Sequence, residues 1–391
     1  MSQQLINRST DLSRLRSEGF DIAIVKDGYL LLRGVPYVNS KKEVKLGTFI
    51  SDLSLANNVT AKPDHHWVFF IGELPCKADG TPLDKFNCSV CQQPLATDLQ
   101  ANYQFSARPP DGYTDYFQKM TTYEAMLSGP AQTIDPAATA RTYKVCEPDE
   151  NESVFKYCDT ASTRVGIYAI TEKLEIGKIA IVGLGGTGSY ILDFVAKTPV
   201  KEIHLFDGDK FLQHNAFRAP GAPSGLELDE QIPKTVYFER IYSKMRRGII
   251  SHPEYINSGN SDLLRDMNFV FLCVDNGSAK KFIIEKLEEF GISFVDAGMG
   301  VLNSSGSLCG ILRVSTSTPA QRASARAQIS FADDDANNEY NQNIQIAELN
   351  ALNAALAVIK WKKLLGFYVD MDKEHFCAYT ISGNVMDNKD E

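Results

Sequence analysis

The sequence predicts an α/β fold in which a doubly wound, mostly parallel sheet follows a smaller N-terminal α+β domain. The first observation is an apolar run at residues 178–182, KIAIV, whose lack of polar alternation is typical of a strand covered on both faces. The second observation is that strands and helices alternate. Apolar runs at residues 202–206 and 269–274 predict strands, and a helix is predicted from residue 278 to residue 290, ending at Gly291. This alternation indicates parallel βαβ units.

The segment after residue 182 reads GLGGTG and contains Gly183, Gly185, Gly186 and Gly188. The spacing G-x-G-x-x-G is typical of phosphate-binding turns, in which the first glycine permits the turn, the second lets a phosphate approach, and the third lets helix and strand pack closely. The N–H groups that begin the following helix favour an anion. The next strand ends at Asp207, where a nucleotide-binding unit places its ribose-binding carboxylate. The alternative is a turn in which backbone only packs on backbone.

Composition limits the class of protein. The chain has 391 residues, 43% of them hydrophobic, which suffices for two packed domains. Its net charge of -9 argues against non-specific binding to nucleic acid or to an anionic membrane. The polar amino terminus lacks a signal-peptide core and no long apolar run occurs, so we expect a cytoplasmic location. The eight cysteines are then expected to be reduced thiols.

The N-terminal part is expected to be a small mixed domain. Short apolar runs separated by Gly, Pro and Asn predict strands at residues 20–25, 29–32 and 67–71. Apolar residues at three- and four-residue steps predict a helix over residues 113–127. Prolines and an acidic stretch follow, so we place a domain boundary near residue 150, between an accessory domain (1–150) and a nucleotide domain (151–391).

Three cysteines of the N-terminal part, Cys76, Cys88 and Cys91, have more than one interpretation. The last two have the spacing C-x-x-C, with which one short loop presents two thiolates to a zinc ion. A second C-x-x-C is absent, so ordinary thiols are an alternative. A third option is that one of these thiols is a nucleophile.

The C-terminal part contains two further predicted strands, at residues 294–297 and 310–314. Residues 315–345 are small and polar, which favours a long crossover loop acting as a lid. A long helix that packs on the sheet is predicted to end near Gly366. The tail from residue 383 is expected to be a frayed terminus.

The residues after Asp207 indicate which kind of nucleotide-dependent reaction the domain performs. An ordered series of matches runs through GLGGTG, Asp207, Asp209, Asn215-Ala-Phe-Arg218, Lys234 and Val274-Asp275-Asn276. By this series the chain resembles the ThiF-type adenylating family, which includes ubiquitin-like-activating enzymes and the bacterial enzymes of thiamine and molybdopterin synthesis. The resemblance covers about residues 160–370 and implies a Rossmann-like sheet.

The resemblance also implies roles for individual residues. Asp207 is expected to hold the ribose hydroxyls, with Asp209 beside it, and Asp275 to hold Mg²⁺. Asn215, Arg218 and Lys234 are expected to contact the triphosphate. Attack of a carboxylate on the α-phosphate adds negative charge to phosphoryl oxygens, so fixed cations and a metal should be aimed there. In members that form dimers a further arginine crosses the interface to the γ-phosphate, and Arg164 is the candidate.

The implied function is ATP- and Mg²⁺-dependent adenylation of the C-terminal carboxylate of a small ubiquitin-like or sulfur-carrier protein ending in glycine. A homodimer, a later thioester and a conjugating-enzyme partner are implied by the family alone. The chain has no cysteine between Cys309 and Cys377, where thioester-forming relatives carry one. Candidate nucleophiles are therefore Cys76, Cys88, Cys91 and Cys309, although Cys309 and Cys273 read as packing residues.

Two other functions remain open from the sequence. An NAD-dependent oxidoreductase would use the same glycines and Asp207, but it needs neither a metal-binding carboxylate nor a triphosphate-binding lysine. A non-catalytic nucleotide-binding scaffold would bind ATP and leave recognition to the N-terminal domain.

Overall fold

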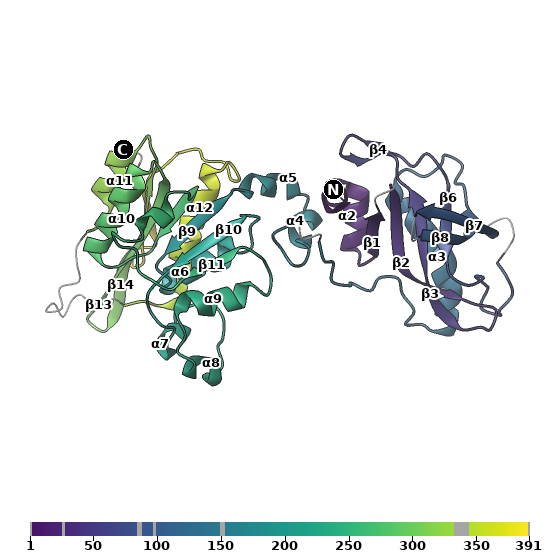
Figure 1. Cartoon of the computed structure of the whole chain (residues 1–391), viewed down its shortest axis with the longest axis horizontal. Coiled ribbons are helices and arrows are strands. Elements are labelled where there is room, and N and C mark those ends of the chain that lie inside the picture. Colours follow the sequence, from purple (N-terminus) through teal and green to yellow (C-terminus); the bar gives the residue numbers. More distant parts are fainter. Residues whose placement is uncertain are drawn as a thin grey trace. The chain divides into compact units, whose positions relative to one another are not determined.

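The computed structural model describes residues 2–25, 28–83, 88–96, 99–148, 153–331 and 344–389. The chain forms two compact units. The first consists of Met1–Ser153 with Tyr157–Ala169, and the second of Val154–Lys156 with Ile170–Glu391. In Figure 1 the first unit runs from purple to blue-green and the second from teal to yellow.

The first unit is built on an antiparallel sheet with the strand order β1-β2-β3-β6-β8-β7. Its strands are β1 (Asp21–Val25), β2 (Tyr29–Val38), β3 (Val44–Asp52), β6 (Trp67–Ile71), β7 (Cys88–Ala96) and β8 (Leu99–Ser106). Two short strands, β4 (Leu55–Ala56) and β5 (Val59–Thr60), pair separately. Its helices are α1 (Ser2–Arg8), α2 (Thr10–Ser17), α3 (Tyr116–Ile134) and α4 (Thr160–Arg164), and α5 (Tyr168–Thr171) straddles the division between the units. The three predicted strands are present here.

Helix α3 covers one face of this sheet. The predicted periodic residues Tyr116, Met120, Tyr123 and Leu127 are all buried, and they pack in one cluster with aromatic side chains of β3, β6 and β8. The Asp115 side chain accepts a hydrogen bond from the backbone N–H of residue 118 and so caps the helix. The helix is longer than predicted, because it continues through a proline at position 130.

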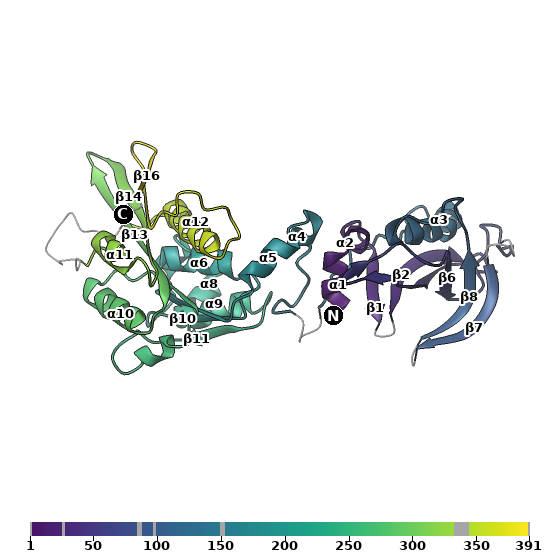
Figure 2. The same ribbon diagram turned by 90° about the horizontal axis from the view of Figure 1, so that it is seen from above.

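The second unit is built on a sheet with the strand order β11-β10-β9-β12-β13-β14-β15-β16. The first five strands in this order are parallel and the rest pair antiparallel. The strands are β9 (Lys178–Val182), β10 (Glu202–Phe206), β11 (Ile249–His252), β12 (Phe269–Leu272), β13 (Ser293–Ser304), β14 (Ser307–Ser317), β15 (Phe376–Thr380) and β16 (Val385–Lys389). The predicted doubly wound, mostly parallel fold is confirmed (Figures 1 and 2).

Helices and short turns connect these strands. They are η1 (Glu172–Leu174), α6 (Gly186–Val195), α7 (Gln213–Ala216), α8 (Gly225–Asp229), α9 (Lys234–Tyr242), η2 (Ser261–Leu264), α10 (Gly277–Glu289), α11 (Arg322–Gln328) and α12 (Ala347–Leu364). None of the helices in the described residues is long and apolar enough to span a membrane.

Strand β9 is buried on both faces, as its unbroken apolar run predicts. Ile179 and Ile181 pack in one cluster with α6, α9 and α12, whereas Ala180 and Val182 pack in another with α10. The fully buried Trp361 of α12 belongs to the first of these clusters. Helices therefore cover both faces, which is the arrangement that parallel sheets require.

The strands predicted at residues 294–297 and 310–314 are present, and they form the long arms of an antiparallel hairpin joined by Ser305 and Gly306, which both have positive φ. Two other expectations for the C-terminal part were wrong in detail. The tail is an edge strand, β16, paired with β15 rather than frayed. Its polar composition concealed this, since an exposed edge strand needs no apolar run. The segment 315–345 is not all loop, because it begins inside β14 and contains α11, while residues 332–343 lie outside the described residues.

The start of α6 leaves no room for a side chain at Gly188. A Cβ there would lie 1.9 Å from the carbonyl oxygen of Gly183, which is backbone and has little freedom to move. We therefore expect Gly188→Ala to lower the free energy of unfolding of the second unit by about 1–3 kcal/mol. Urea unfolding followed by Trp361 fluorescence, in a chain whose other tryptophan, Trp67, is replaced by phenylalanine, measures this.

The matched control is Gly225→Ala, because a Cβ at Gly225 would meet no atom within 4 Å. Its unfolding free energy should stay within about 0.5 kcal/mol of the parent chain. Equal unfolding midpoints for the two alanine variants would contradict the packing argument.

Candidate functional site

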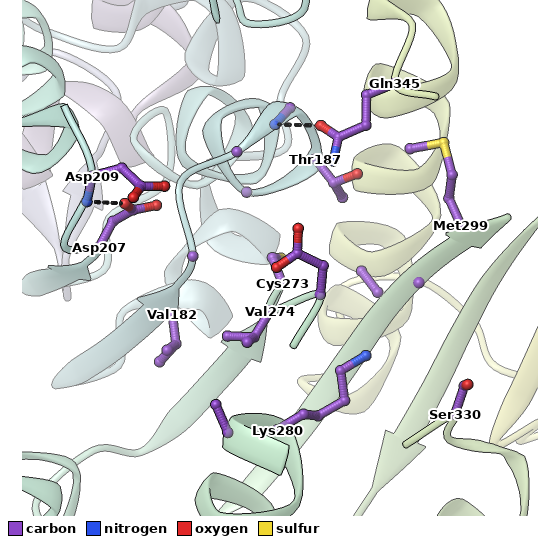
Figure 3. A pocket seen from close by; sticks show the side chains of 18 of the residues that line it. Val182, Thr187, Asp207, Asp209, Cys273, Val274, Lys280, Met299, Ser330 and Gln345 are labelled. Carbon is purple, nitrogen blue, oxygen red and sulfur yellow. Dashed lines mark hydrogen bonds between the residues drawn. The ribbon is translucent and has the colours of Figure 1, made fainter. Parts of the chain in front are cut away.

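A cavity lies at the carboxyl end of β9, where the strand order reverses. Strands β10 and β12 flank β9 on opposite sides, so the connections from β9 and β12 leave in different directions and open a crevice. The cavity has a volume of 420 Å³, within the usual range for small-molecule sites. Its polar lining includes Thr187, Asp207, Asp209, Arg218, Lys234, Tyr255, Asp275, Lys280, Arg313, Ser330 and Gln345. Figure 3 shows the cavity from close by.

The glycine turn forms one wall of this cavity. Gly183 has a φ of +91°, and a Cβ there would lie 2.5 Å from the backbone oxygen of Cys273. Only glycine satisfies both conditions without strain. At Gly185 the nearest atom to an added Cβ is 3.9 Å away, so this position is open to the cavity. The glycines therefore divide their roles as the sequence predicts, with Gly185 at the open position.

Gly186 has a role that the sequence did not reveal. A Cβ there would lie 1.9 Å from the side chain of Asn350 in α12, so this glycine allows α6 and α12 to meet. The Gly186 N–H donates to the amide oxygen of Gln345 at 3.3 Å (Figure 3). The Thr187 hydroxyl donates to the Asn350 oxygen at 3.2 Å. The start of α6 thus points N–H groups at the cavity, where an anion is favoured.

Two aspartates and a lysine form the wall next to β10. Asp207 is buried and accepts hydrogen bonds from the backbone N–H of Leu184 at 2.7 Å and of Asp209 at 2.8 Å. The ammonium of Lys234 lies 2.7 Å from Asp209 and 3.4 Å from Asp207. Each carboxylate oxygen can accept two hydrogen bonds, so the contacts with Lys234 occupy acceptor positions that the two backbone N–H groups leave on Asp207.

Tyr255 closes this wall. Its hydroxyl donates a hydrogen bond to Asp209, and its ring occupies the space that a side chain at Gly208 would need. The bond to Asp209, together with burial, raises the pKa of Tyr255 to about 12. Burial raises the pKa of Asp209, but the hydrogen bonds from Lys234 and Tyr255 outweigh this, so its pKa lies below the usual value. Asp209 is therefore a carboxylate at neutral pH.

Arg218 and Asn215, predicted as a pair, have different surroundings. Arg218 lines the cavity, and its Nε is buried without a hydrogen-bond partner in the part of the chain that the structure describes. Asn215 is buried and is absent from the lining, and its side-chain oxygen accepts from the backbone N–H of Leu212 at 2.8 Å. The asparagine thus shapes the turn that carries the arginine.

Asp275 lies three residues after the end of β12, and its exposed side chain lines the cavity. The cap of the following helix is Asn276, whose side chain accepts from the backbone N–H of Ala279 at 2.8 Å. No cluster of three or more His, Cys, Asp or Glu side chains suited to a metal occurs in the described residues. A Mg²⁺ ion held by one or two carboxylates and by substrate phosphates would not need such a cluster.

A buried ion pair at the floor of the cavity was missed in the sequence. The Lys280 ammonium lies 3.1 Å from a carboxylate oxygen of Asp296, and both residues are at least nine-tenths buried. Arg313 of β14 also lines the cavity. The sequence offered one signal, since Lys280 lies in the first two turns of the helix that begins after Asp275.

Of the remaining predicted residues, Cys273 belongs to the cavity lining and Arg164 and Cys309 do not. Arg164 is exposed at the end of α4, in the first unit. Cys273 lines the cavity, but burial raises its pKa, which disfavours the thiolate. Cys309 is half-buried in β14 and is not a lining residue.

The candidate zinc ligands belong to the first unit. Cys76 is buried, and burial raises its pKa, which makes it a poor nucleophile. The Cys91 thiol lies 3.8 Å from the amide oxygen of Gln93. The side chain of Cys88 lies outside the described residues, so the zinc prediction for this group stays a prediction.

This geometry agrees with the comparison to known families. Residues 157–388 match the ThiF family, and residues 10–160 match a domain of unknown function, DUF6791. The match to the ThiF family spans more than half of the chain, so the chain belongs to this family.

Two groups of similar proteins extend this comparison. Over 150 residues the chain is 27% identical to ubiquitin-like modifier-activating enzyme 5 of Aedes aegypti and 25% identical to that of Rattus norvegicus. These alignments cover 36% of this chain and 38% and 37% of those proteins, so the chain matches less than half of their length. Among solved structures, E. coli MccB is 17% identical with a TM-score of 0.44, covering 59% of this chain and 65% of that chain. PaaA is 16% identical with a TM-score of 0.43, covering 57% and 76%.

The Lys280–Asp296 pair can be tested through stability. Lys280→Met leaves a buried carboxylate without its cation, so we expect a loss of about 3–5 kcal/mol in the free energy of unfolding. The loss should be smaller near about pH 5 than near about pH 8, because burial raises the pKa of Asp296 and a protonated carboxyl is cheaper to bury. Urea unfolding at both pH values measures it.

Two further variants make this test specific. Adding Asp296→Asn to Lys280→Met removes both charges and should recover at least half of the loss. The neighbouring exposed lysine supplies a matched control, so Lys281→Met should change stability by less than about 0.5 kcal/mol. If Lys280→Met and Lys281→Met behave alike, the ion pair does not stabilise the fold.

Proposed function

We propose that this chain catalyses ATP-dependent adenylation of the C-terminal carboxylate of a small ubiquitin-like or sulfur-carrier protein. The observation that carries the proposal is one cavity lined by a helix N-terminus, by an arginine whose buried Nε has no hydrogen-bond partner among the described residues, and by an exposed carboxylate. Membership of the ThiF family and similarity to proteins named ubiquitin-like modifier-activating enzymes support the substrate class.

The cationic side of the cavity suits a polyphosphate. The N–H groups at the start of α6 and the guanidinium of Arg218 line the same space. A buried donor without a partner is costly, and a phosphate oxygen would satisfy it with a charge-assisted hydrogen bond. When a carboxylate attacks the α-phosphate and pyrophosphate departs, negative charge grows on these oxygens, so fixed donors aimed at them lower the barrier.

The wall formed by Asp207, Asp209 and Lys234 suits a ribose. Asp207 is held rigidly by two backbone N–H groups, and the third partner of the carboxylate, Lys234, approaches it only to 3.4 Å. We infer that the ribose hydroxyls replace this weak contact with Asp207. Lys234 would then keep its contact with Asp209 and would also contact the phosphates. Tyr255 would then border the nucleoside.

Asp275 is the residue that fits a Mg²⁺ ion. Its carboxylate is exposed in the cavity, and Mg²⁺ prefers oxygen ligands with several of them supplied by phosphates and water. When bound, Mg²⁺ would neutralise charge on the phosphate oxygens. The protein's part would be to hold this ion through the Asp275 carboxylate.

The floor of the cavity suits a tail without side chains. Gly298 and Gly300 of β13 line it, and a Cβ at Gly300 would meet no atom within 4 Å. Ser330, at the middle of segment 315–345, and Gln345, at its end, line the cavity as well. A C-terminal tail ending in glycine would fit between them, as the lid interpretation requires.

The later steps and the assembly are further parts of the proposal. A homodimer in which Arg164 of one copy reaches the phosphates of the other, thioester transfer, and a conjugating enzyme rest on the family resemblance. The first unit is proposed to recognise the carrier protein, and the location is proposed to be cytoplasmic.

The test is ATP:pyrophosphate exchange with purified ubiquitin-like proteins of the host cell that end in glycine. Exchange should require Mg²⁺ and disappear when the carrier lacks its last residue. Arg218→Ala should lower the exchange rate by about a hundredfold or more, because one fixed donor to the developing charge is lost. Asp275→Asn should raise the Mg²⁺ concentration needed for half-maximal exchange. Arg240→Ala, an exposed arginine outside the cavity, is the matched control and should exchange normally.

Other outcomes identify the rival functions. Binding of NAD in place of ATP, without a metal, would indicate an oxidoreductase and overturn the proposal. ATP binding with no exchange for any of these carriers would indicate a nucleotide-binding scaffold and would also overturn it.

A further inference from the structure

Two cysteines of the first unit that have no part in the proposed adenylation lie side by side. The thiol of Cys158 donates to the sulfur of Cys146 at an S–S separation of 2.7 Å. Their backbones are joined too, because the Cys158 N–H donates to the Cys146 carbonyl oxygen at 2.8 Å. A disulfide has a sulfur separation of about 2.05 Å, so the two sulfurs need to approach by less than about 1 Å to bond.

The surroundings of the pair favour a reactive thiolate. The hydrogen bond from Cys158 lowers the pKa of Cys146 to about 6, against the effect of burial, and the charge of Arg16 adds to the lowering. The same hydrogen bond and burial raise the pKa of Cys158. Cys146 is therefore the nucleophilic member and Cys158 the resolving member.

We propose that Cys146 and Cys158 form a redox-modification site at which hydrogen peroxide converts the thiol pair into a reversible intramolecular disulfide. The Cys146 thiolate attacks one peroxide oxygen, the O–O bond breaks, and a sulfenic acid and hydroxide form. The Cys158 sulfur then attacks the Cys146 sulfur, the S–O bond breaks, and water leaves. Two thiols and one peroxide give one disulfide and two waters, with two electrons passing from the sulfurs to the peroxide.

The disulfide would close residues 146–158 into a ring at the connection between the two units. Within this ring, Val154–Lys156 belong to the second unit. Val154 accepts from the Arg247 N–H at 2.7 Å, and the Lys156 N–H donates to Met245 at 2.9 Å. Oxidation therefore restrains the segment through which the chain leaves the first unit, and it should stabilise the folded chain by reducing the freedom of the unfolded one.

The experiment treats the full-length protein with hydrogen peroxide, blocks the remaining thiols with N-ethylmaleimide, and digests with trypsin. Cleavage after Lys144, Lys156 and Arg164 separates the two cysteines into peptides 145–156 and 157–164. Mass spectrometry should find these two peptides joined after peroxide and separate after dithiothreitol. The midpoint of thermal unfolding, followed by Trp67 fluorescence in a Trp361→Phe chain, should rise by at least about 5 °C on oxidation.

Variants distinguish selective oxidation of the Cys146–Cys158 pair from unselective oxidation of any thiol. Cys158→Ser should stop the reaction at the sulfenic acid of Cys146, which dimedone traps, and Cys146→Ser should abolish peptide joining. Cys91→Ser, which removes a thiol outside the pair, should leave joining unchanged. The proposal is overturned if peroxide oxidises Cys91 or Cys309 to sulfinic or sulfonic acid before peptides 145–156 and 157–164 are joined, or if either cysteine pairs elsewhere.

Discussion

The close approach of helix α6 to the turn after β9 is the contact on which the second unit depends. Gly183 packs on the backbone of residue 273, and Gly188 packs on Gly183 itself, so two glycines bring one helix and two strands together. Because no side chain intervenes, the N–H groups of α6 begin at the carboxyl edge of the sheet. The same contact that packs the core therefore places the start of α6 in the cavity lining, where its N–H groups favour an anion.

The charged residues at the cavity differ in burial and in pairing. Two buried ion pairs, Asp207 with Lys234 and Lys280 with Asp296, stabilise its walls. Arg218 and Asp275 also line the cavity, the first with a buried Nε that has no hydrogen-bond partner in the described residues and the second with an exposed carboxylate. The buried ion pairs thus stabilise the walls of the cavity that these two side chains share.

Prediction from the sequence succeeded where a local pattern reflects a local cause. The apolar run of β9, the glycine spacing and the periodicity of α3 each follow from the burial of one element. It failed for β16, because this strand forms only by pairing with the edge of β15. It also failed for Gly186, because the residue that leaves no room for a side chain there is Asn350, far along the chain. Lys280 and Arg313 were missed for the same reason, because only the fold brings Lys280 next to Asp296 and places both cations in the cavity lining.

The sequence by itself determined the doubly wound sheet, the phosphate-type turn and the family, since these depend on residue spacing within one βαβ unit and on an ordered series of motifs. The tertiary structure alone decided which charges are paired and which face the cavity, and that Asn276 rather than Asp275 caps its helix. It also brought Cys146 and Cys158 together. The physical reason is that pairing and burial depend on distances across the folded chain, which no spacing along the sequence specifies.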